Sequence, residues 1–222
     1  MPDVRAIAFD AYGTLFDVHS VMAACREVTA DPEALSLQWR AKQLEYTWLR
    51  ALMGRYEDFW EVTQAALRFS LRRLAIEASE AQVGRLMEAY LSLSPFPEVP
   101  ETLKALHPRC ALAILSNGSP RMLQAAVESS GLKPYLHHVI SVDSLRTYKP
   151  NPAVYDLAHK TMGVPANTVA FVSSNSFDVV GAKAFGLRVC WCNRAGAPLD
   201  ALGFAPDVTV RRLDEIPTAL GL

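Results

Sequence analysis

Four short polar segments of the chain, each preceded by an apolar run, carry the residue types that could do chemistry. One such segment on its own would be read as a turn or a helix cap, and its polar side chains would then be structural. Four of them, each following an apolar run, indicate instead a shared site. The segments contain, in chain order, Asp10, Tyr12 and Thr14; Ser116 and Asn117; Lys149; and Ser173, Asn175 and Asp178.

Asp10 is the residue of this set best suited to attack a substrate. An opposite charge within a few ångströms lowers the pKa of an aspartate by about 1–3 units, so Lys149 is expected to keep Asp10 ionised. An ionised carboxylate can act as a nucleophile and form a covalent ester, which splits one difficult step into two easier ones. Asp178 is the second acid of the set, although an acid near the start of a helix also stabilises that helix without any catalytic role.

The apolar runs predict the strands that position these residues. Near-continuous apolar sequence is typical of parallel strands covered on both faces, and helical patterns separate the runs. The predicted strands are 4–10, 110–116, 139–142, 168–173 and 187–192, and the predicted helices between them are 119–131, 151–163 and about 178–186. This alternation predicts an α/β fold with a doubly wound, mostly parallel sheet and a Rossmann-like core. Ligands bind such sheets at the carboxyl ends of the strands, where the four polar segments should meet.

A helical insertion is predicted between the first strand and the rest of the sheet. Its helical periodicity is interrupted at Asp31-Pro32, at Gly54 and near Ala78-Ser79, which predicts about four helices. The proline-rich stretch 95–100 is expected to be the linker that returns to the sheet, because prolines cannot continue a helix. We therefore expect a discontinuous core domain of residues 1–16 and 97–222, and a helical-bundle cap domain of residues 17–96.

One helix of the insertion carries an apolar stripe with a charged residue at its edge. On a helical wheel, Leu37, Leu44, Trp48 and Ala51 form the stripe, which predicts a packing face, and Arg40 lies at its margin. Arg40 then has two readings. Its stem covers apolar surface while its head reaches solvent, or it faces the interior and forms an anion site in a cleft.

Composition excludes several classes of protein. The chain has 222 residues, 50% of them hydrophobic, with a formal net charge of −1, so neither disorder nor a broad nucleic-acid surface is expected. No apolar stretch is long enough to cross a membrane. The first residues show no secretory signal pattern, and the four cysteines are sparse, so we expect a cytoplasmic protein with reduced thiols.

The four segments resemble, in order and type, the four motifs of the haloacid dehalogenase superfamily. The matching stretches are residues 9–15 (Phe-Asp-Ala-Tyr-Gly-Thr-Leu), 115–118 (Leu-Ser-Asn-Gly), 148–150 (Tyr-Lys-Pro) and 171–178 (Phe-Val-Ser-Ser-Asn-Ser-Phe-Asp). More narrowly, the chain resembles the L-2-haloacid dehalogenases, of which Arg40 and the stretches 44–47 and 173–175 are typical. The resemblance covers the whole chain, including the helical insertion.

Two positions depart from the phosphatases of that superfamily. Phosphatases of this kind carry a second aspartate where this chain has Tyr12, and they carry an acidic pair for Mg²⁺ where this chain has Ser174 and retains only Asp178. A departing halide needs no proton, and a haloacid has no phosphoryl dianion for a metal to neutralise. Both replacements are therefore consistent with dehalogenation without a metal or any other cofactor.

The resemblance implies roles for individual residues. Asp10 would displace the halide as nucleophile, Asp178 would activate the hydrolytic water, and Arg40 with Asn117 would receive the halide. The implied catalytic residues are Asp10, Thr14, Arg40, Ser116, Lys149, Tyr155, Ser173, Asn175 and Asp178. The implied substrate-binding residues are Tyr12, Arg40, Leu44, Phe59, Ser116, Asn117 and Phe177.

The expected activity is hydrolytic dehalogenation of short-chain L-2-haloalkanoic acids to D-2-hydroxy acids, with inversion and through an ester on Asp10. The expected partners are the haloacid, the halide ion and a second copy of the chain in a homodimer, with no nucleic acid and no membrane. The alternatives are a magnesium-dependent phosphatase, a hydrolase of a related non-halogenated acid such as azetidine carboxylate, and a non-catalytic binding protein on the same fold.

Overall fold

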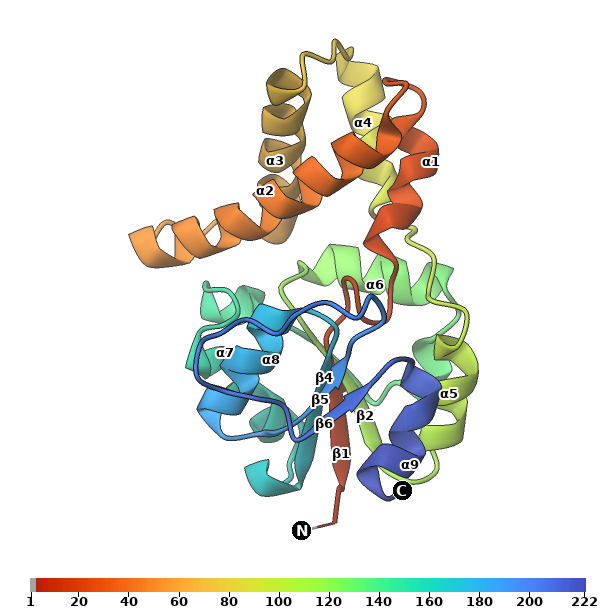
Figure 1. The fold of residues 1–222 in the computed structure, drawn as a ribbon, viewed down its shortest axis with the longest axis vertical. Coiled ribbons are helices and arrows are strands. Elements are labelled where there is room, and N and C mark those ends of the chain that lie inside the picture. Colours follow the sequence, from red (N-terminus) through yellow and green to blue (C-terminus); the bar gives the residue numbers. More distant parts are fainter. Residues whose placement is uncertain (1–2) are drawn as a thin grey trace.

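The computed structural model describes residues 3–222, so the first two residues of the predicted core domain lie outside the described residues. A six-stranded parallel sheet forms its centre (Figure 1), with the strand order β3-β2-β1-β4-β5-β6. The strands are β1 (Ala6–Phe9), β2 (Ala111–Ser116), β3 (His138–Ser141), β4 (Val169–Ser173), β5 (Arg188–Cys192) and β6 (Val208–Val210). The order reverses between β1 and β4, which confirms the doubly wound prediction.

Helices cover both faces of the sheet. In Figure 1, α7 and α8 lie on one side of the sheet, and α5 and α9 lie on the other. Their bounds are α5 (Val99–Leu106), α6 (Pro120–Ser129), α7 (Pro152–Met162), α8 (Ser176–Phe185) and α9 (Ile216–Leu220). The centre of the sheet is therefore shielded from solvent, which explains why β1 and β4 consist entirely of buried residues, while the edge strands β3 and β6 are partly exposed.

Three elements escaped the sequence-based prediction. β6 has only three residues, and α9 has five, so neither carries enough sequence for a periodicity to emerge. The stretch 95–100 was predicted to be linker, but α5 begins at Val99 and includes Pro100. A proline is tolerated in the first turn of a helix because its missing N–H would have no partner there.

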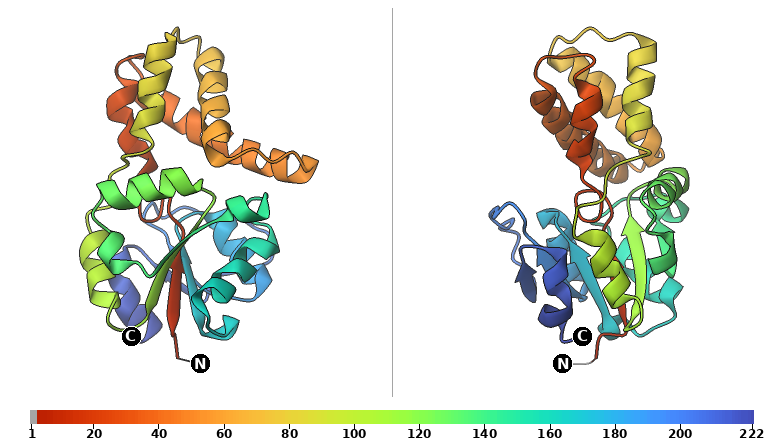
Figure 2. Two further views of the ribbon diagram at one scale, coloured as in Figure 1. Left: turned by 180° about the vertical axis from the view of Figure 1, so that it is seen from behind. Right: turned by 90° about the vertical axis from the view of Figure 1, so that its right-hand side faces the viewer.

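The inserted helices follow the predicted breaks. They are α1 (Met22–Cys25), α2 (Pro32–Met53), α3 (Phe59–Arg73) and α4 (Glu80–Ala89). Asp31 caps the start of α2, Gly54 ends it in the left-handed conformation, and Ser79 forms a capping box at the start of α4. We refer to residues 17–96 as the cap segment. It lies above the carboxyl ends of the strands in the views of Figures 1 and 2.

The apolar stripe predicted on α2 is wrong as the packing face within the cap segment. Leu37 is 52% exposed, and the later stripe residues Leu44 and Trp48 face the core instead. The buried face of α2 consists of Leu35, Ser36, Trp39, Gln43 and Thr47. A wheel that counts apolar residues missed this face because its polar members are paired internally: Gln43 Nε2 donates to Thr63 Oγ1 at 2.6 Å.

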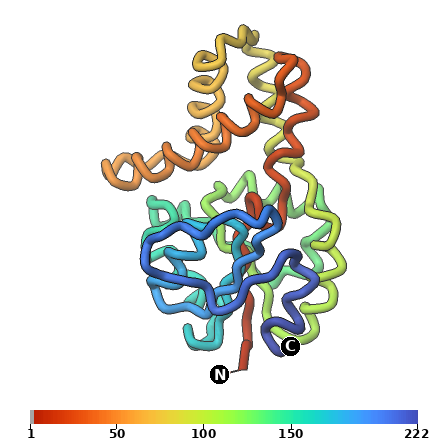
Figure 3. The backbone as a smooth tube through the Cα atoms, in the orientation of Figure 1, coloured from red at the N-terminus to blue at the C-terminus, as the bar shows by residue number. Residues whose placement is uncertain are grey.

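The two linkers of the cap segment run side by side (Figure 3). Phe16 forms an antiparallel bridge with Pro95, and the amide of Asp17 donates to the carbonyl of Ser94 at 2.8 Å. The amide of Phe96 donates to the carbonyl of Leu15 at 3.0 Å. The chain thus leaves the core and returns to it at one place.

Candidate active site

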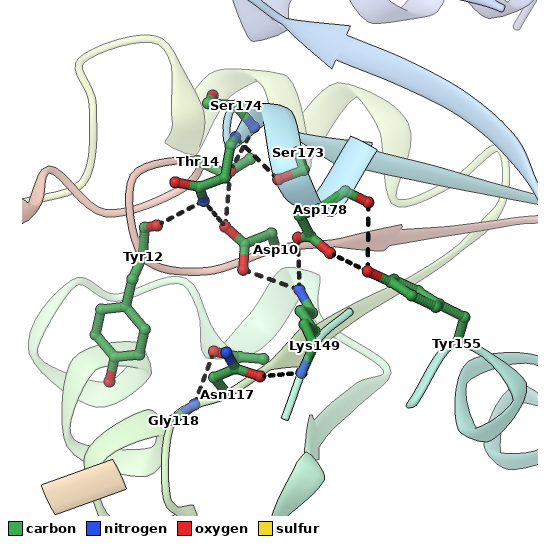
Figure 4. Close-up of polar contacts among 12 residues, drawn as sticks. Asp10, Tyr12, Thr14, Asn117, Gly118, Lys149, Tyr155, Ser173, Ser174 and Asp178 are labelled. Atoms are coloured by element: carbon green, nitrogen blue, oxygen red, sulfur yellow. Dashed lines mark hydrogen bonds and ion pairs between the residues drawn. The ribbon is translucent and has the colours of Figure 1, made fainter. Parts of the chain in front are cut away.

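Three buried charges meet at the carboxyl ends of the strands (Figure 4). Lys149 Nζ lies 2.9 Å from Asp10 Oδ1 and 2.9 Å from Asp178 Oδ2. The side chain of Lys149 is 1% exposed and that of Asp178 is fully buried. Asp10 follows β1, Asp178 lies in the first turn of α8, and Lys149 lies on the loop before α7, so three different connections supply this cluster.

Burial and the neighbouring charges shift the pKa values of Asp178 and Lys149. Burial raises the pKa of Asp178 to about 6; the charge of Lys149 opposes this shift and the charge of Asp10 adds to it. For Lys149, burial alone would lower the pKa, but the two carboxylates outweigh burial and raise it. The lysine therefore stays charged, and the Asp178 carboxyl titrates closer to neutrality than an ordinary aspartate does.

Asp10 is held in one orientation by donors on its other oxygen. Thr14 Oγ1 donates to Asp10 Oδ2 at 3.0 Å, and Asn175 Nδ2 donates to the same oxygen at 2.8 Å. The backbone amide of Ser174 in turn donates to Thr14 Oγ1 at 2.8 Å. Asn175 also donates to the carbonyl of Tyr12 at 3.1 Å, so one amide group joins the nucleophile candidate to its own loop.

The loop after β2 supports Lys149 from below. Asn117 Oδ1 accepts from the Lys149 backbone amide at 2.9 Å, and Ser116 Oγ accepts from the amide of Gly118 at 3.1 Å. A side chain at Gly118 would meet the Tyr12 ring at 2.7 Å. This close approach requires glycine, and it lets the Tyr12 ring lie against the loop.

Tyr155, in α7, contacts the cluster formed by Asp10, Lys149 and Asp178. Its hydroxyl donates to Asp178 Oδ1 at 2.8 Å, and burial together with the nearby carboxylate raises the pKa of Tyr155 far above its usual value. The hydroxyl therefore remains a donor at every working pH. Ser173 lies behind the site, where its Oγ accepts from the amide of Asn175 at 3.1 Å and fixes that turn.

Arg40 points from α2 into the space between the cap segment and the core. Its Nη2 donates to the carbonyl of Tyr12 at 3.0 Å and lies 3.4 Å from Asn175 Oδ1, while Nη1 donates to Gln43 Oε1 at 2.8 Å. Of the two readings of Arg40, the structure has the one that faces the interior. Its guanidinium is thus available to an anion beside Asp10.

A cavity of about 10 Å³, room for about one water molecule, lies between these groups. It is lined by Asp10, Tyr12, Arg40, Leu44, Phe59, Ser116, Asn117, Lys149, Asn175 and Phe177. All seven predicted substrate-binding residues are among them. Four predicted catalytic residues are not among the lining residues, but each contacts the site through a neighbour: Thr14, Tyr155, Ser173 and Asp178.

Two residues beside the site were not singled out in the sequence. Gln43 holds Arg40 in place, and Arg194 contacts the loop that carries Thr14. Gln43 carries no signal that separates it from a solvated helix residue. Arg194 could have been found, because it follows the strand 187–192 just as the other site residues follow theirs.

Fold and site together define an α/β protein whose candidate reactive group is a buried aspartate after the first strand, paired with a lysine. Residues 4–186 match the model of the haloacid dehalogenase-like hydrolases. The chain belongs to this family.

Similar proteins come from several bacteria. The chain is 49% identical to haloacetate dehalogenase H-2 of Moraxella sp. (strain B), over 97% of each chain. It is 46% identical to an (S)-2-haloacid dehalogenase of Pseudomonas sp. (strain YL), over 96% of this chain and 93% of that one. A solved L-2-haloacid dehalogenase of Xanthobacter autotrophicus with chloropropionic acid covalently bound is 42% identical, with a TM-score of 0.91 and 97% of each chain covered. No described helix is both long and apolar enough to cross a membrane.

Proposed function

We propose that this protein hydrolyses short-chain L-2-haloalkanoic acids to D-2-hydroxy acids, with inversion and without a metal. The observation that carries the proposal is the Asp10 carboxylate, paired with Lys149 at 2.9 Å and facing a small cavity whose walls combine apolar side chains with the guanidinium of Arg40. The relatives named as haloacid dehalogenases support the same substrate class.

In the first step, an oxygen of Asp10 attacks C2 of the haloacid from the side opposite the halogen. The carbon–halogen bond breaks, the halide leaves with the electron pair, and C2 inverts as the aspartyl ester forms. Arg40 and Asn117 receive the halide, and Ser116 binds the substrate carboxylate. The apolar walls at Tyr12, Leu44, Phe59 and Phe177 hold the alkyl part of the substrate.

In the second step, water attacks the ester carbonyl of Asp10 and gives its proton to Asp178. The bond between the ester carbonyl carbon and the substrate oxygen then breaks, the departing alkoxide takes the proton back from Asp178, and the hydroxy acid leaves. Asp10 returns to a carboxylate by releasing the second proton of the water to solvent. The negative charge of Asp10 is one cause of the raised pKa of Asp178. Esterification removes this charge and so lowers the pKa of Asp178. Asp178 is therefore a carboxylate when the second step needs a base. Thr14, Ser173 and Asn175 orient Asp10 and the water, and Tyr155 orients Asp178.

Metal independence has its own support in the contacts of Asn175. Asp10 Oδ2 and the Tyr12 carbonyl are two oxygens that converge on a single point, as ligands of a hard cation do. The Nδ2 group of Asn175 occupies this point, with bonds of 2.8 and 3.1 Å. An amide at this position supplies hydrogen bonds where a phosphatase would need a metal ligand, which disfavours the phosphatase alternative.

The cap segment and the assembly are part of the proposal. We propose that residues 17–96 act as a cap domain over a core of residues 1–16 and 97–222, and that two chains form a homodimer in the cytoplasm. Apolar side chains are exposed on α2 at Leu37, Leu49, Leu52 and Met53, as expected of an interface. Sedimentation that gives a monomer at micromolar concentration would contradict the dimer.

Halide release from each enantiomer of 2-chloropropionate, with and without EDTA, tests the activity. We expect release from the L-isomer alone, at a rate that EDTA does not change, and a D-lactate product. Asp10→Asn should abolish turnover. No release from the L-isomer overturns the proposal, and inhibition by EDTA restores the metal-dependent alternative.

Azetidine carboxylate is the second electrophile to test with the same enzyme. It is a small cyclic amino acid that the same nucleophile could open at a ring carbon. Turnover of this compound without halide release from any haloacid would favour the non-halogenated alternative.

A further inference from the structure

Arg194, on the loop after β5, joins parts of the chain that are far apart in the sequence. Its Nη2 donates to the carbonyl of Thr14 at 3.0 Å, and its Nη1 donates to Ser174 Oγ at 2.9 Å and lies 3.4 Å from the carbonyl of Gly13. Its Nε and Nη2 donate to Glu98 Oε1 at 3.1 and 2.8 Å. The guanidinium also lies 3.8 Å from the centre of the Phe96 ring.

Two of these contacts lead directly to the nucleophile. Arg194 binds the carbonyl of Thr14, whose hydroxyl donates to Asp10 Oδ2 at 3.0 Å. It also binds the hydroxyl of Ser174, whose amide donates to Thr14 Oγ1 at 2.8 Å. One guanidinium thus holds both Thr14 itself and Ser174, the residue whose amide donates to the Thr14 hydroxyl.

The remaining contacts lead to the linker that returns from the cap segment. Glu98 is almost fully buried, and although burial alone would raise its pKa, hydrogen bonds from its own backbone amide and from Arg194 lower it. Phe96 lies under the guanidinium, and its amide pairs with Leu15 of the outgoing linker. The same side chain therefore also contacts the linker that returns from the cap segment.

We propose that Arg194 is a positioning residue for the reaction: it holds Thr14 and Ser174, and through them the Asp10 carboxylate, in a fixed position relative to the returning linker of the cap segment. It does not act on the substrate, since it is not among the residues that line the cavity. The planar guanidinium is needed because five N–H groups in a fixed fork serve two carbonyls, a hydroxyl and a carboxylate together, which an ammonium group cannot do.

This role rests on the proposed dehalogenation, and Arg194→Met tests it with two readouts. The first is steady-state kinetics on L-2-chloropropionate: we expect kcat to fall by about 10- to 100-fold while KM changes little, because the nucleophile is misplaced and the binding walls are intact. Arg194→Lys, which keeps the charge near Glu98, should recover only part of the loss. If Arg194→Met does not fold, the kinetics of Arg194→Lys test the proposal in its place.

The second readout does not depend on activity. Hydrogen exchange of the Ser174 amide, which is bonded to Thr14, should speed up by about tenfold or more in Arg194→Met. Arg68→Met is the matched control, because Arg68 forms a two-bond ion pair with Glu80 on the surface of the cap segment. It should change neither kcat nor the exchange at Ser174.

The outcomes separate the two proposals. If the wild-type protein releases halide and Arg194→Met leaves either kcat or the exchange rate unchanged, Arg194 is not a positioning residue. A rise in KM at constant kcat would assign it to substrate binding and would also overturn the proposal. If the wild-type protein releases no halide, the proposed function fails, and unchanged exchange at Ser174 alone refutes the role of Arg194.

Discussion

Lys149 between two buried carboxylates sets the electrostatics of the site. Asp10 and Asp178 with Lys149 carry one net negative charge, and Arg40 brings the sum to zero in the free protein. A haloacid anion enters a neutral site, so no strong repulsion opposes its binding. In the proposed ester intermediate, Asp178 would be the only carboxylate paired with Lys149.

Replacing Asp178 should separate the two steps of the reaction. Asp178→Asn removes the proposed base but leaves Asp10 and its donors, so the ester should form and then persist. Mass spectrometry of the intact protein after mixing with L-2-chloropropionate should find the alkylated chain in Asp178→Asn and little of it in the wild type. An unmodified Asp178→Asn chain with normal turnover would contradict the role of Asp178.

The raised pKa of Asp178 also predicts a pH-dependent stability. A carboxyl group whose pKa rises from 3.8 to about 6 on folding stabilises the folded state fully below pH 3.8, and this contribution is lost as the pH rises through about 6. Two pKa units correspond to at most about 3 kcal/mol. The free energy of unfolding of the wild type, minus that of Asp178→Asn, should therefore fall across this pH range in urea titrations. A difference that is constant with pH would refute the shift.

At the scale of elements, the site depends on a close approach of α8 to its neighbours. A side chain at Gly181 in α8 would meet Pro150 at 2.5 Å and the Tyr155 hydroxyl at 2.6 Å. The absence of a side chain at this position lets Tyr155 reach Asp178 and lets the Lys149-Pro150 loop pack against the helix. Gly181 therefore allows both Tyr155 and the Lys149-Pro150 loop to lie close to α8, beside Asp178.

Gly181→Ala should lower both stability and turnover, because Tyr155 and Pro150 must move away from α8 to admit the methyl group. Gly84→Ala is the matched control: Gly84 lies in α4 with no heavy atom within 4 Å of the added Cβ. Alanine should stabilise that helix by about 0.5–1 kcal/mol and leave turnover unchanged. Urea denaturation and halide release measure both effects. Equal behaviour of the two variants would contradict the packing argument.

The elements that sequence could predict are those with a local cause. Helix ends are marked locally, by the capping side chains of Asp31 and Ser79 and by the left-handed backbone of Gly54. The buried strands can be predicted from their continuous apolar sequence. The packing face of α2 could not be predicted in this way, because its polar members Gln43 and Thr47 are buried with their hydrogen bonds satisfied by Thr63 and by the Leu44 carbonyl. The place of Arg194 after a predicted strand could have indicated it, but its partners could not be predicted, because they lie almost 100 or more positions away in the sequence.

At the scale of the whole molecule, the space between the cap segment and the core is narrow. A cavity of about 10 Å³ is smaller than a haloacid, so we expect the cap segment and the core to separate for binding and to close again for reaction. A larger open hollow of about 580 Å³ shares Lys149 and Phe177 with the cavity. Across the boundary, Tyr56 in the cap segment donates to Asp143 Oδ1 at 2.6 Å, and Trp48 packs edge-on against Phe177.

Removing the Tyr56 hydroxyl should weaken closure without touching the reacting groups. In Tyr56→Phe we expect KM for the haloacid to rise by about tenfold, the equivalent of about 1.4 kcal/mol, with kcat little changed. Tyr46→Phe is the control, because Tyr46 packs on Phe69 within the cap segment. Steady-state kinetics measure both KM values. An unchanged KM in Tyr56→Phe would show that the hydrogen bond from Tyr56 to Asp143 does not stabilise the closed state.

The paired linkers at Phe16 and Pro95 also bear on the order in which the chain folds. Joining the ends of an excursion of about 80 residues costs roughly 4 kcal/mol of chain entropy when the excursion is unfolded. A cap segment that has already packed its own helices brings these ends together in advance. Parallel pairing of β1 with β2, which lie on either side of the excursion, then becomes a nearly local event, and the folding rate of the sheet becomes sensitive to the stability of helices that contribute no strand to it.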